Sequence, residues 1–157
     1  MLALNNANAT ETSPLTLDAL RALRAQAFFA AGVDRGAAAF VIALDESAEY
    51  DNPNFAWFRA RFGGFVYIDR VVTAREERGR GLARELYKRL LVLATAAGRR
   101  WLVCEINADP PNLASQAFHD AFGFEVVGRA QVTAQQKIVD YLAMRLPPTP
   151  GGTRRPG

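Results

Sequence analysis

The sequence is poor in cysteine and histidine, with one of each, and it lacks any long hydrophobic run. With Cys104 alone, no disulfide can form within the chain, and its position in the apolar stretch WLVCEI favours packing over nucleophilic chemistry. No stretch of 18 apolar residues is present to cross a membrane. The opening stretch MLALNNANATETSP lacks the basic start and apolar centre of a signal peptide, so we expect a soluble, cytoplasmic protein with no membrane partner.

What the sequence does contain suits one domain with a locally basic surface. A chain of 157 residues, half of them hydrophobic, is enough for a single core. The formal net charge is only +3, but basic residues gather in one stretch: Arg75, Arg78, Arg80, Arg84, Lys88 and Arg89. Two interpretations stay open, a site for a phosphate-bearing partner or a solvated helix face with glutamates as counterions.

The hydrophobic pattern predicts alternating helices and strands. Apolar residues at helical spacing predict helices over residues 14–28, 81–97 and 112–122. Period-two and β-branched stretches predict strands over residues 28–35, 36–46, 65–74, 101–108, 124–132 and 137–146. The aromatic stretch 47–64 is predicted to be a loop with one helical turn. This order predicts an α/β (mixed α+β) domain with a mixed sheet.

The two ends of the domain are set by composition. Residues 1–146 carry the predicted elements and form one domain. Residues 147–157, PPTPGGTRRPG, contain too much proline and glycine to pack, so a disordered C-terminal tail is predicted there.

The stretch Arg78-Gly-Arg-Gly81 lies between a predicted strand and a predicted helix. The first N–H groups of a helix have no partner within it, and together with the helix dipole they favour an anion. Gly79 and Gly81 lack side chains, so a pyrophosphate could approach the backbone closely. Nearby arginines add positive charge. The sequence therefore predicts an anion site at the start of this helix.

Two common nucleotide motifs do not fit this stretch. A dinucleotide fingerprint requires a third glycine where this sequence has Arg84, and the lysine of a P-loop is absent. Instead, Arg78-Gly-Arg-Gly81-Leu-Ala83 after the strand VYIDRVVTA resembles the acetyl-CoA motif of GNAT-type N-acetyltransferases. A second stretch, NLASQAFHDAFGF from Asn112 to Phe124, resembles the other signature of that family at matching spacing. The resemblance covers residues 65–146 well and the first 64 only through element order.

The resemblance implies a fold and a cofactor. The fold would be one GNAT-like domain with a twisted, mostly antiparallel sheet that splays between strands 65–73 and 101–107. Acetyl-CoA would be the acetyl donor and would bind in that gap, with no metal. The residues implied in cofactor binding are Val71, Val72, Thr73, Arg78, Gly79, Arg80, Gly81, Leu82, Ala83, Arg84, Asn112 and Ser115.

His119 stands where the family more often has a tyrosine that protonates the leaving CoA thiolate. Asn112, Ser115 and His119 recur at i, i+3 and i+7 and form one polar stripe on their helix. An imidazole can donate a proton near neutrality, so His119 is the candidate general acid. Packing against the cofactor and the absence of any role are the alternatives.

The amine substrate must lose protons before it attacks, so a base is needed. Glu105 and Asp69 are the candidates, because each lies in an otherwise apolar strand where an unpaired carboxylate would be costly. Asp69 could instead pair with Arg70 or Arg99, and Glu105 could be structural. Glu105 is the predicted catalytic carboxylate because it lies near the splay. Asn107 could orient the substrate.

The aromatic loop at residues 50–62 is the predicted wall of the substrate pocket. It could also cover the core or form the contact of a homodimer. The chain is thus predicted to be an acyltransferase that acetylates a small-molecule or peptide amine in a ternary complex. The alternatives are a non-catalytic acyl-CoA-binding module and a nucleic-acid-binding domain. Nucleic acid is not the expected partner, because no base-stacking aromatics are interleaved with the arginines.

Overall fold

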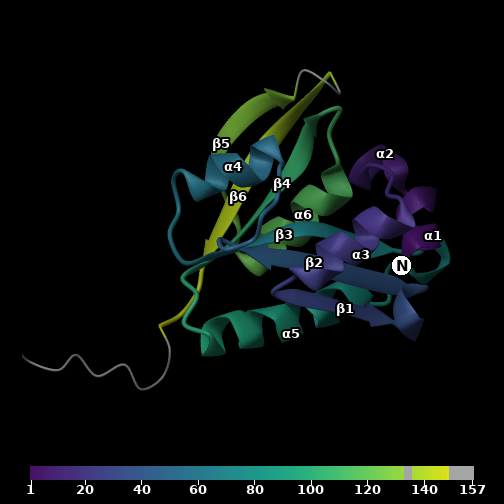
Figure 1. Cartoon of the computed structure of the whole chain (residues 1–157). Helices are drawn as coiled ribbons and strands as arrows, with labels where there is room; N and C mark the ends of the chain where they lie inside the picture. Colours follow the sequence, from purple (N-terminus) through teal and green to yellow (C-terminus); the bar gives the residue numbers. More distant parts are fainter. Residues whose placement is uncertain (133–135, 149–157) are drawn as a thin grey trace, which may run out of the picture.

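The computed structural model describes residues 1–132 and 136–148 (Figure 1). Six strands form one sheet: β1 (Phe29–Val33), β2 (Ala39–Asp45), β3 (Phe65–Thr73), β4 (Trp101–Asp109), β5 (Glu125–Val132) and β6 (Lys137–Arg145). The helices are α1 (Leu2–Ala7), α2 (Ala9–Thr12), α3 (Leu17–Ala25), α4 (Pro53–Arg59), α5 (Leu82–Ala96) and α6 (Leu113–Phe122). Short 3₁₀ turns occupy η1 (Asp34–Gly36) and η2 (Arg75–Glu77). The predicted mixed α/β domain is confirmed.

The sheet has the strand order β1-β2-β3-β4-β6-β5. All neighbouring pairs are antiparallel except β3 and β4, which run parallel. The parallel ladder covers only Phe65–Tyr67 against Trp101–Val103, although both strands continue well beyond it. Among the described residues, the inner edges of β3 and β4 past that point have no strand partner. The sheet therefore splays between these two strands, as predicted.

Both faces of the sheet are covered, and β2 shows why its sequence is an unbroken apolar run. Its alternate residues Ala39, Val41 and Ala43 pack in the core shared with α5. Phe40, Ile42 and Leu44 pack in a second core with α3 and α4 on the opposite face. A strand buried on both faces reads as continuously hydrophobic rather than alternating.

The stretch 47–64, predicted as a loop with one helical turn, contains a two-turn helix, α4. The side chain of Asn52 accepts hydrogen bonds from the N–H groups of Asn54 (2.9 Å) and Phe55 (3.1 Å), and Pro53 occupies the first turn. Such an N-cap followed by proline is a helix start signal. Phe55 and Phe58 are fully buried, so tertiary packing stabilises a helix that is too short to form alone.

The N-terminal residues, for which no element was predicted, form α1 and α2. Asn5 is fully buried there and accepts a hydrogen bond from Arg70 Nη1 of β3 at 2.8 Å. Its side chain also donates to the carbonyl oxygen of Ser13 at 3.0 Å. The bond from Arg70 ties the N-terminal helices to the sheet beside the splay, where Figure 1 places them, and the bond to Ser13 joins the two ends of the N-terminal segment.

Other boundaries differ little from the predicted ones. The first predicted helix is shorter than expected, because Thr16 caps α3 by accepting from the N–H of Ala19 at 3.1 Å. Residues 149–157 of the predicted tail lie outside the described residues. In the part of the chain that is described, no helix is long and apolar enough to span a membrane.

Candidate functional site

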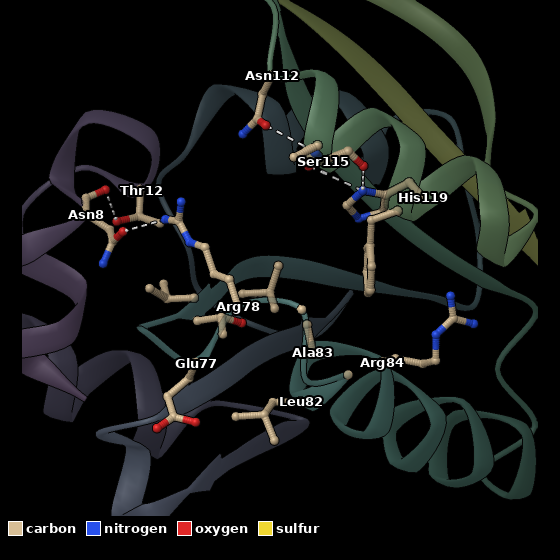
Figure 2. Close-up of a pocket in the computed structure, with 17 residues that line it drawn as sticks. Asn8, Thr12, Glu77, Arg78, Leu82, Ala83, Arg84, Asn112, Ser115 and His119 are labelled. Carbon is tan, nitrogen blue, oxygen red and sulfur yellow. Dashed lines mark hydrogen bonds between the residues drawn. The ribbon is translucent and has the colours of Figure 1, made fainter. Parts of the chain in front are cut away.

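A cavity of about 450 Å³ lies where β3 leads into α5. Figure 2 shows Asn8 and Thr12 on one wall, Asn112, Ser115 and His119 of the α6 segment on another, and the start of α5 at the base. Its lining includes most of the residues that the resemblance implied for the cofactor: Val71, Val72, Thr73, Arg78, Gly79, Gly81, Leu82, Ala83, Arg84, Asn112 and Ser115. Arg80 is not part of this lining, and its guanidinium pairs with Glu77.

The first turn of α5 opens into this cavity. Gly81 is the N-cap in the left-handed conformation (φ 76°), and within the described residues no side chain caps the helix. Gly79 is also left-handed (φ 78°), and a Cβ built on either glycine would meet no described atom within 4 Å. Helix N–H groups, positive dipole and open space therefore coincide, which is the arrangement that binds an anion.

The basic residues predicted around this turn divide between the two interpretations. Arg78 lines the cavity and donates to Asn8 Oδ1 at 3.2 Å, and Arg84 lines it with its guanidinium 5.5 Å from the ring centroid of Phe122. Lys88 instead pairs with Glu85 on the exposed helix face. Part of the cluster is thus a solvated face, and part of it lines the cavity at the start of α5.

A second cavity of about 510 Å³ lies in the splay between β3 and β4. It shares five lining residues with the first cavity: Thr12, Val71, Asn112, Ser115 and His119. The two cavities therefore meet at these residues. The described charged lining of the second cavity is Asp69, Glu105, Arg70 and Lys137, and its other polar lining includes Tyr50, Asn52, Asn54 and Asn107.

Glu105 of β4 is held in this second cavity by hydrogen bonds from two side chains, the hydroxyl of Tyr67 being shared between its two carboxylate oxygens. Its carboxylate accepts from Tyr67 Oη at 2.8 and 2.9 Å and from Asn54 Nδ2 at 3.0 Å. Tyr141 of β6 in turn donates to Asn54 Oδ1 at 2.9 Å, so that four residues form one chain. Burial raises the pKa of Glu105 to about 7, although the bonds from Tyr67 and Asn54 oppose the rise. A carboxylate with this pKa can take up a proton near neutrality.

Asp69 forms the ion pair that was one of its two predicted roles. Its carboxylate accepts from Arg70 Nε at 2.6 Å and from Tyr50 Oη at 2.6 Å. The side chains of Asp69 and Arg70 are only 3% and 4% exposed, so each needs the other as a counterion. Arg99, the other predicted partner, pairs with Asp45 instead.

His119 is buried at the junction of the cavities, with 3% of its surface exposed. Its Nδ1 lies 2.7 Å from the carbonyl oxygen of Ser115, which can only accept, so Nδ1 carries a proton. Nε2 lies 2.9 Å from the hydroxyl of Tyr87. Burial lowers the pKa of His119, so the ring is neutral at pH 7, and Nε2 accepts the hydrogen bond from Tyr87. The predicted stripe is present, because Asn112, Ser115 and His119 line both cavities. Asn112 also caps α6 by accepting from Ser115 N at 3.1 Å.

Several residues of the site were not predicted for it. Asn8 and Thr12 line the cavities from the N-terminal segment. Tyr67, which donates to Glu105, and Tyr87, which lines the second cavity, were predicted only as parts of a strand and a helix. Asn54 belongs to the stretch 50–62 that was predicted as the pocket wall, but its bond to Glu105 was not predicted, and the Asn52-Pro53 cap signal could have placed it on a helix. No local pattern in the sequence distinguishes a tyrosine whose hydroxyl bonds to a site residue from a tyrosine that only packs in the core.

Comparison with solved structures shows the same fold. The ribosomal-protein-S18-alanine N-acetyltransferase from Escherichia coli matches with a TM-score of 0.69 at 14% identity, over 99% of this chain and 92% of that one. An N-acetyltransferase from Staphylococcus aureus Mu50 matches with a TM-score of 0.66 at 22% identity, over 93% and 90%. The structure of yncA from Salmonella typhimurium with its cofactor acetyl-CoA matches with a TM-score of 0.52 at 20% identity, over 75% and 63%.

Comparison at the level of sequence identifies the family. No curated protein matches the chain. The family model described as the acetyltransferase (GNAT) family matches residues 6–124, which is most of the chain and includes both motifs and the N-terminal wall of the cavities. This protein therefore belongs to the acetyltransferase (GNAT) family and is an acyltransferase.

Proposed function

We propose that the protein transfers an acetyl group from acetyl-CoA to a primary amine by direct attack while both are bound. The observation that carries this proposal is the meeting of two unlike cavities at Val71, Asn112, Ser115 and His119. A donor in the first cavity and an amine in the second would bring their reacting groups together at this junction. Holding both reactants in place removes much of the entropic part of the barrier.

The first cavity is proposed to hold acetyl-CoA. The N–H groups from Arg78 to Arg84 would bind the pyrophosphate at the start of α5. Past Tyr67, β3 pairs only with β2 among the described residues, so the backbone of Val71–Thr73 offers hydrogen-bonding groups to the pantetheine arm. The same edge would donate an N–H to the carbonyl oxygen as it gains charge in the tetrahedral intermediate. The acetyl-CoA in the Salmonella typhimurium neighbour supports this choice of donor.

The second cavity is proposed to hold the amine, with Glu105 as its base. An ammonium group suits a cavity lined by carboxylate and amide oxygens. Near its pKa of about 7, Glu105 can take a proton from that ammonium, which leaves a neutral nitrogen able to attack. The Escherichia coli neighbour is named for an alanine of ribosomal protein S18, so peptide N-termini belong among the first amines to try.

Calorimetric titration with acetyl-CoA tests the cofactor site. Wild type is expected to bind with a dissociation constant of about 1 to 100 μM, in the usual range for metabolite sites. Gly81→Glu places a carboxylate in the anion site and should weaken binding at least about tenfold. Gly98→Glu is the matched control, because Gly98 is also left-handed (φ 69°) and exposed but lines neither cavity. A folded wild type that does not bind acetyl-CoA would refute the proposal.

Release of free CoA thiol across an amine panel tests the reaction. The panel contains peptides with a free N-terminus, peptides with an internal lysine, free amino acids, polyamines and aminoglycosides. Turnover of at least one class is expected. Binding of acetyl-CoA with no turnover of any class would favour the alternative, a non-catalytic acyl-CoA-binding module, for which histidine at position 119, in place of the family's more common tyrosine, is the motivating observation.

A further inference from the structure

Among the described residues, four charged side chains line the second cavity, and two of them neutralise each other. Asp69 and Arg70 form an ion pair at 2.6 Å, and both side chains are almost fully buried. The other two charged residues are Glu105 of β4 and Lys137 of β6. The cavity therefore contains one carboxylate and one ammonium group for which this ion pair does not account.

Glu105 has only neutral hydrogen-bond partners. Its carboxylate accepts from the hydroxyl of Tyr67 and from the side-chain amide of Asn54. In the described part of the chain, no arginine or lysine forms an ion pair with Glu105. A buried carboxylate without a counterion is costly, so an ammonium group of a ligand would fill this need.

Lys137 is the complementary case. Its Nζ donates a hydrogen bond to the carbonyl oxygen of Thr10 at 2.6 Å, and Thr10 of α2 lines the same cavity. The ammonium group of Lys137 therefore lies beside the α2 wall of the cavity. An ammonium group has three donors, and this bond uses one of them. Because no described carboxylate pairs with Lys137, its charge is available to an anionic group of a ligand.

The pairing of β4 with β6 sets the spacing of the two charges. Glu105 is paired with Tyr141, and Lys137 precedes Tyr141 by four residues on β6. At about 3.3 Å per residue, the backbone positions of Tyr141 and Lys137 are about 13 Å apart along the strand. The carboxyl carbon of an α-amino acid lies only about 2.5 Å from its amino nitrogen. A longer molecule therefore matches the two charges better than a free α-amino acid.

We infer that the amine substrate carries a carboxylate several bonds from its amino group, and that Lys137 binds this carboxylate while Glu105 faces the ammonium. This inference rests on the proposed acetyl transfer and specifies the class of its amine. A peptide with an acidic residue among its first three positions has the required chemistry. A peptide with a basic residue there would instead place a second cation beside Lys137.

Matched peptides test the inference through kcat/KM. Amidated peptides of one length carry a single glutamate at position 1, 2 or 3, and each has a counterpart with glutamine, which has a similar shape without the charge. Wild type should favour at least one glutamate peptide over its counterpart by about tenfold or more, as for a hydrogen bond between charged groups. A preference for free alanine over alaninamide, with none within the peptide pairs, would overturn the inference.

Substitution of Lys137 separates recognition of charge from support of the fold. Lys137→Gln keeps an N–H donor for Thr10 but loses the charge, so the preference should fall to within about twofold while kcat/KM for the glutamine peptides stays unchanged. Lys137→Arg keeps the charge and should retain most of the preference. Lys88→Gln is the control, because the other lysine of the sequence pairs with Glu85 and lines neither cavity. Equal losses for glutamate and glutamine peptides in Lys137→Gln would overturn the recognition role.

Binding without turnover separates failure of this inference from failure of the proposed function. The peptides are titrated into protein saturated with CoA, which has no acetyl group to transfer. Because the sequence has two lysines, ¹³C-labelled lysine gives two Cε signals, and a glutamate peptide should shift that of Lys137 but not that of Lys88. If wild type binds acetyl-CoA but no glutamate peptide binds more tightly than its counterpart or shifts the Lys137 signal, the inference is overturned and the proposed function stands. A wild type that binds no acetyl-CoA would refute the proposed function, and this inference with it.

Discussion

The two cavities that meet at His119 differ in construction. The first, proposed to hold acetyl-CoA and so named the cofactor cavity, is formed largely by one continuous stretch, from the end of β3 to the first turn of α5, and offers backbone N–H groups and arginines. The second, proposed to hold the amine and so named the amine cavity, is assembled from segments far apart in the chain, among them α2, α4, β3, β4, α6 and β6. Its charged lining is mixed, with Asp69 and Glu105 beside Arg70 and Lys137. The proposed anion site is thus built locally, whereas the proposed amine site depends on long-range packing.

Glu105→Gln should have the largest effect, on the amine side only. The amide keeps an oxygen that can accept from Tyr67 and Asn54 but cannot take a proton from the amine. We expect kcat to fall by about a hundredfold or more, the usual effect of removing a general base, with unchanged acetyl-CoA binding by calorimetry. The rise of kcat through pH 7 should disappear as well. A variant with wild-type kcat would assign the base to another group.

The same substitution should stabilise the protein at alkaline pH. Burial raises the folded-state pKa of Glu105 from 4.5 to about 7, so between these values the folded state binds more protons than the unfolded state. Ionisation of Glu105 therefore lowers the free energy of unfolding as the pH rises through this window. Relative to wild type, the melting temperature of Glu105→Gln should increase by a few degrees between about pH 4.5 and pH 8. A difference in melting temperature between variant and wild type that stays constant across that pH range would show that burial does not destabilise the ionised form of Glu105.

The contrast between the cavities explains what the sequence could predict. The cofactor cavity is lined by a strand end, two glycines and a helix start in succession, so local patterns were enough to predict that these residues lie together. The strands of the sheet could be predicted equally well, because apolar runs such as that of β2 identify strands directly. The amine side joins residues far apart in the chain: Asn54, Glu105 and Tyr141 meet only after α4 docks on β4 and β6.

Helix α4 and the Tyr87–His119 pair show why the remainder was missed. The isolated stretch around α4 is rich in turn formers, and its helix depends on burying Phe55 and Phe58. Spacing along α6 placed His119 on a polar stripe, but it could not show which residue of α5 faces that stripe. Contacts between elements follow from packing in three dimensions, which periodicity within one element does not contain.

Asn54→Leu should have a smaller effect that depends on pH. The hydrogen bond from the side-chain amide of Asn54 lowers the pKa of Glu105. Loss of this hydrogen bond should therefore move the rise in kcat to higher pH. An upward displacement by one pH unit would lower kcat about fivefold at pH 7, with recovery at pH 9. Tyr141→Phe leaves the donors to Glu105 in place and should displace the profile less. A loss of kcat that is the same at pH 7 and pH 9 would contradict this mechanism.

Arg84→Ala should have the smallest effect, and on the cofactor side only. Arg84 lines the cofactor cavity but is exposed, and solvent screens the attraction of an exposed charge for phosphate. We expect acetyl-CoA to bind about threefold more weakly at low salt, since exposed pairs contribute up to about 1 kcal/mol. The difference should vanish above about 0.5 M salt, where the Debye length falls below about 5 Å. Arg89→Ala is the control, because this arginine lies on the same helix outside the cavity lining and should leave binding unchanged. Equal weakening by both substitutions would mean that α5 attracts the cofactor through its overall charge, and the backbone N–H groups at Gly81 would then provide the specificity of the anion site.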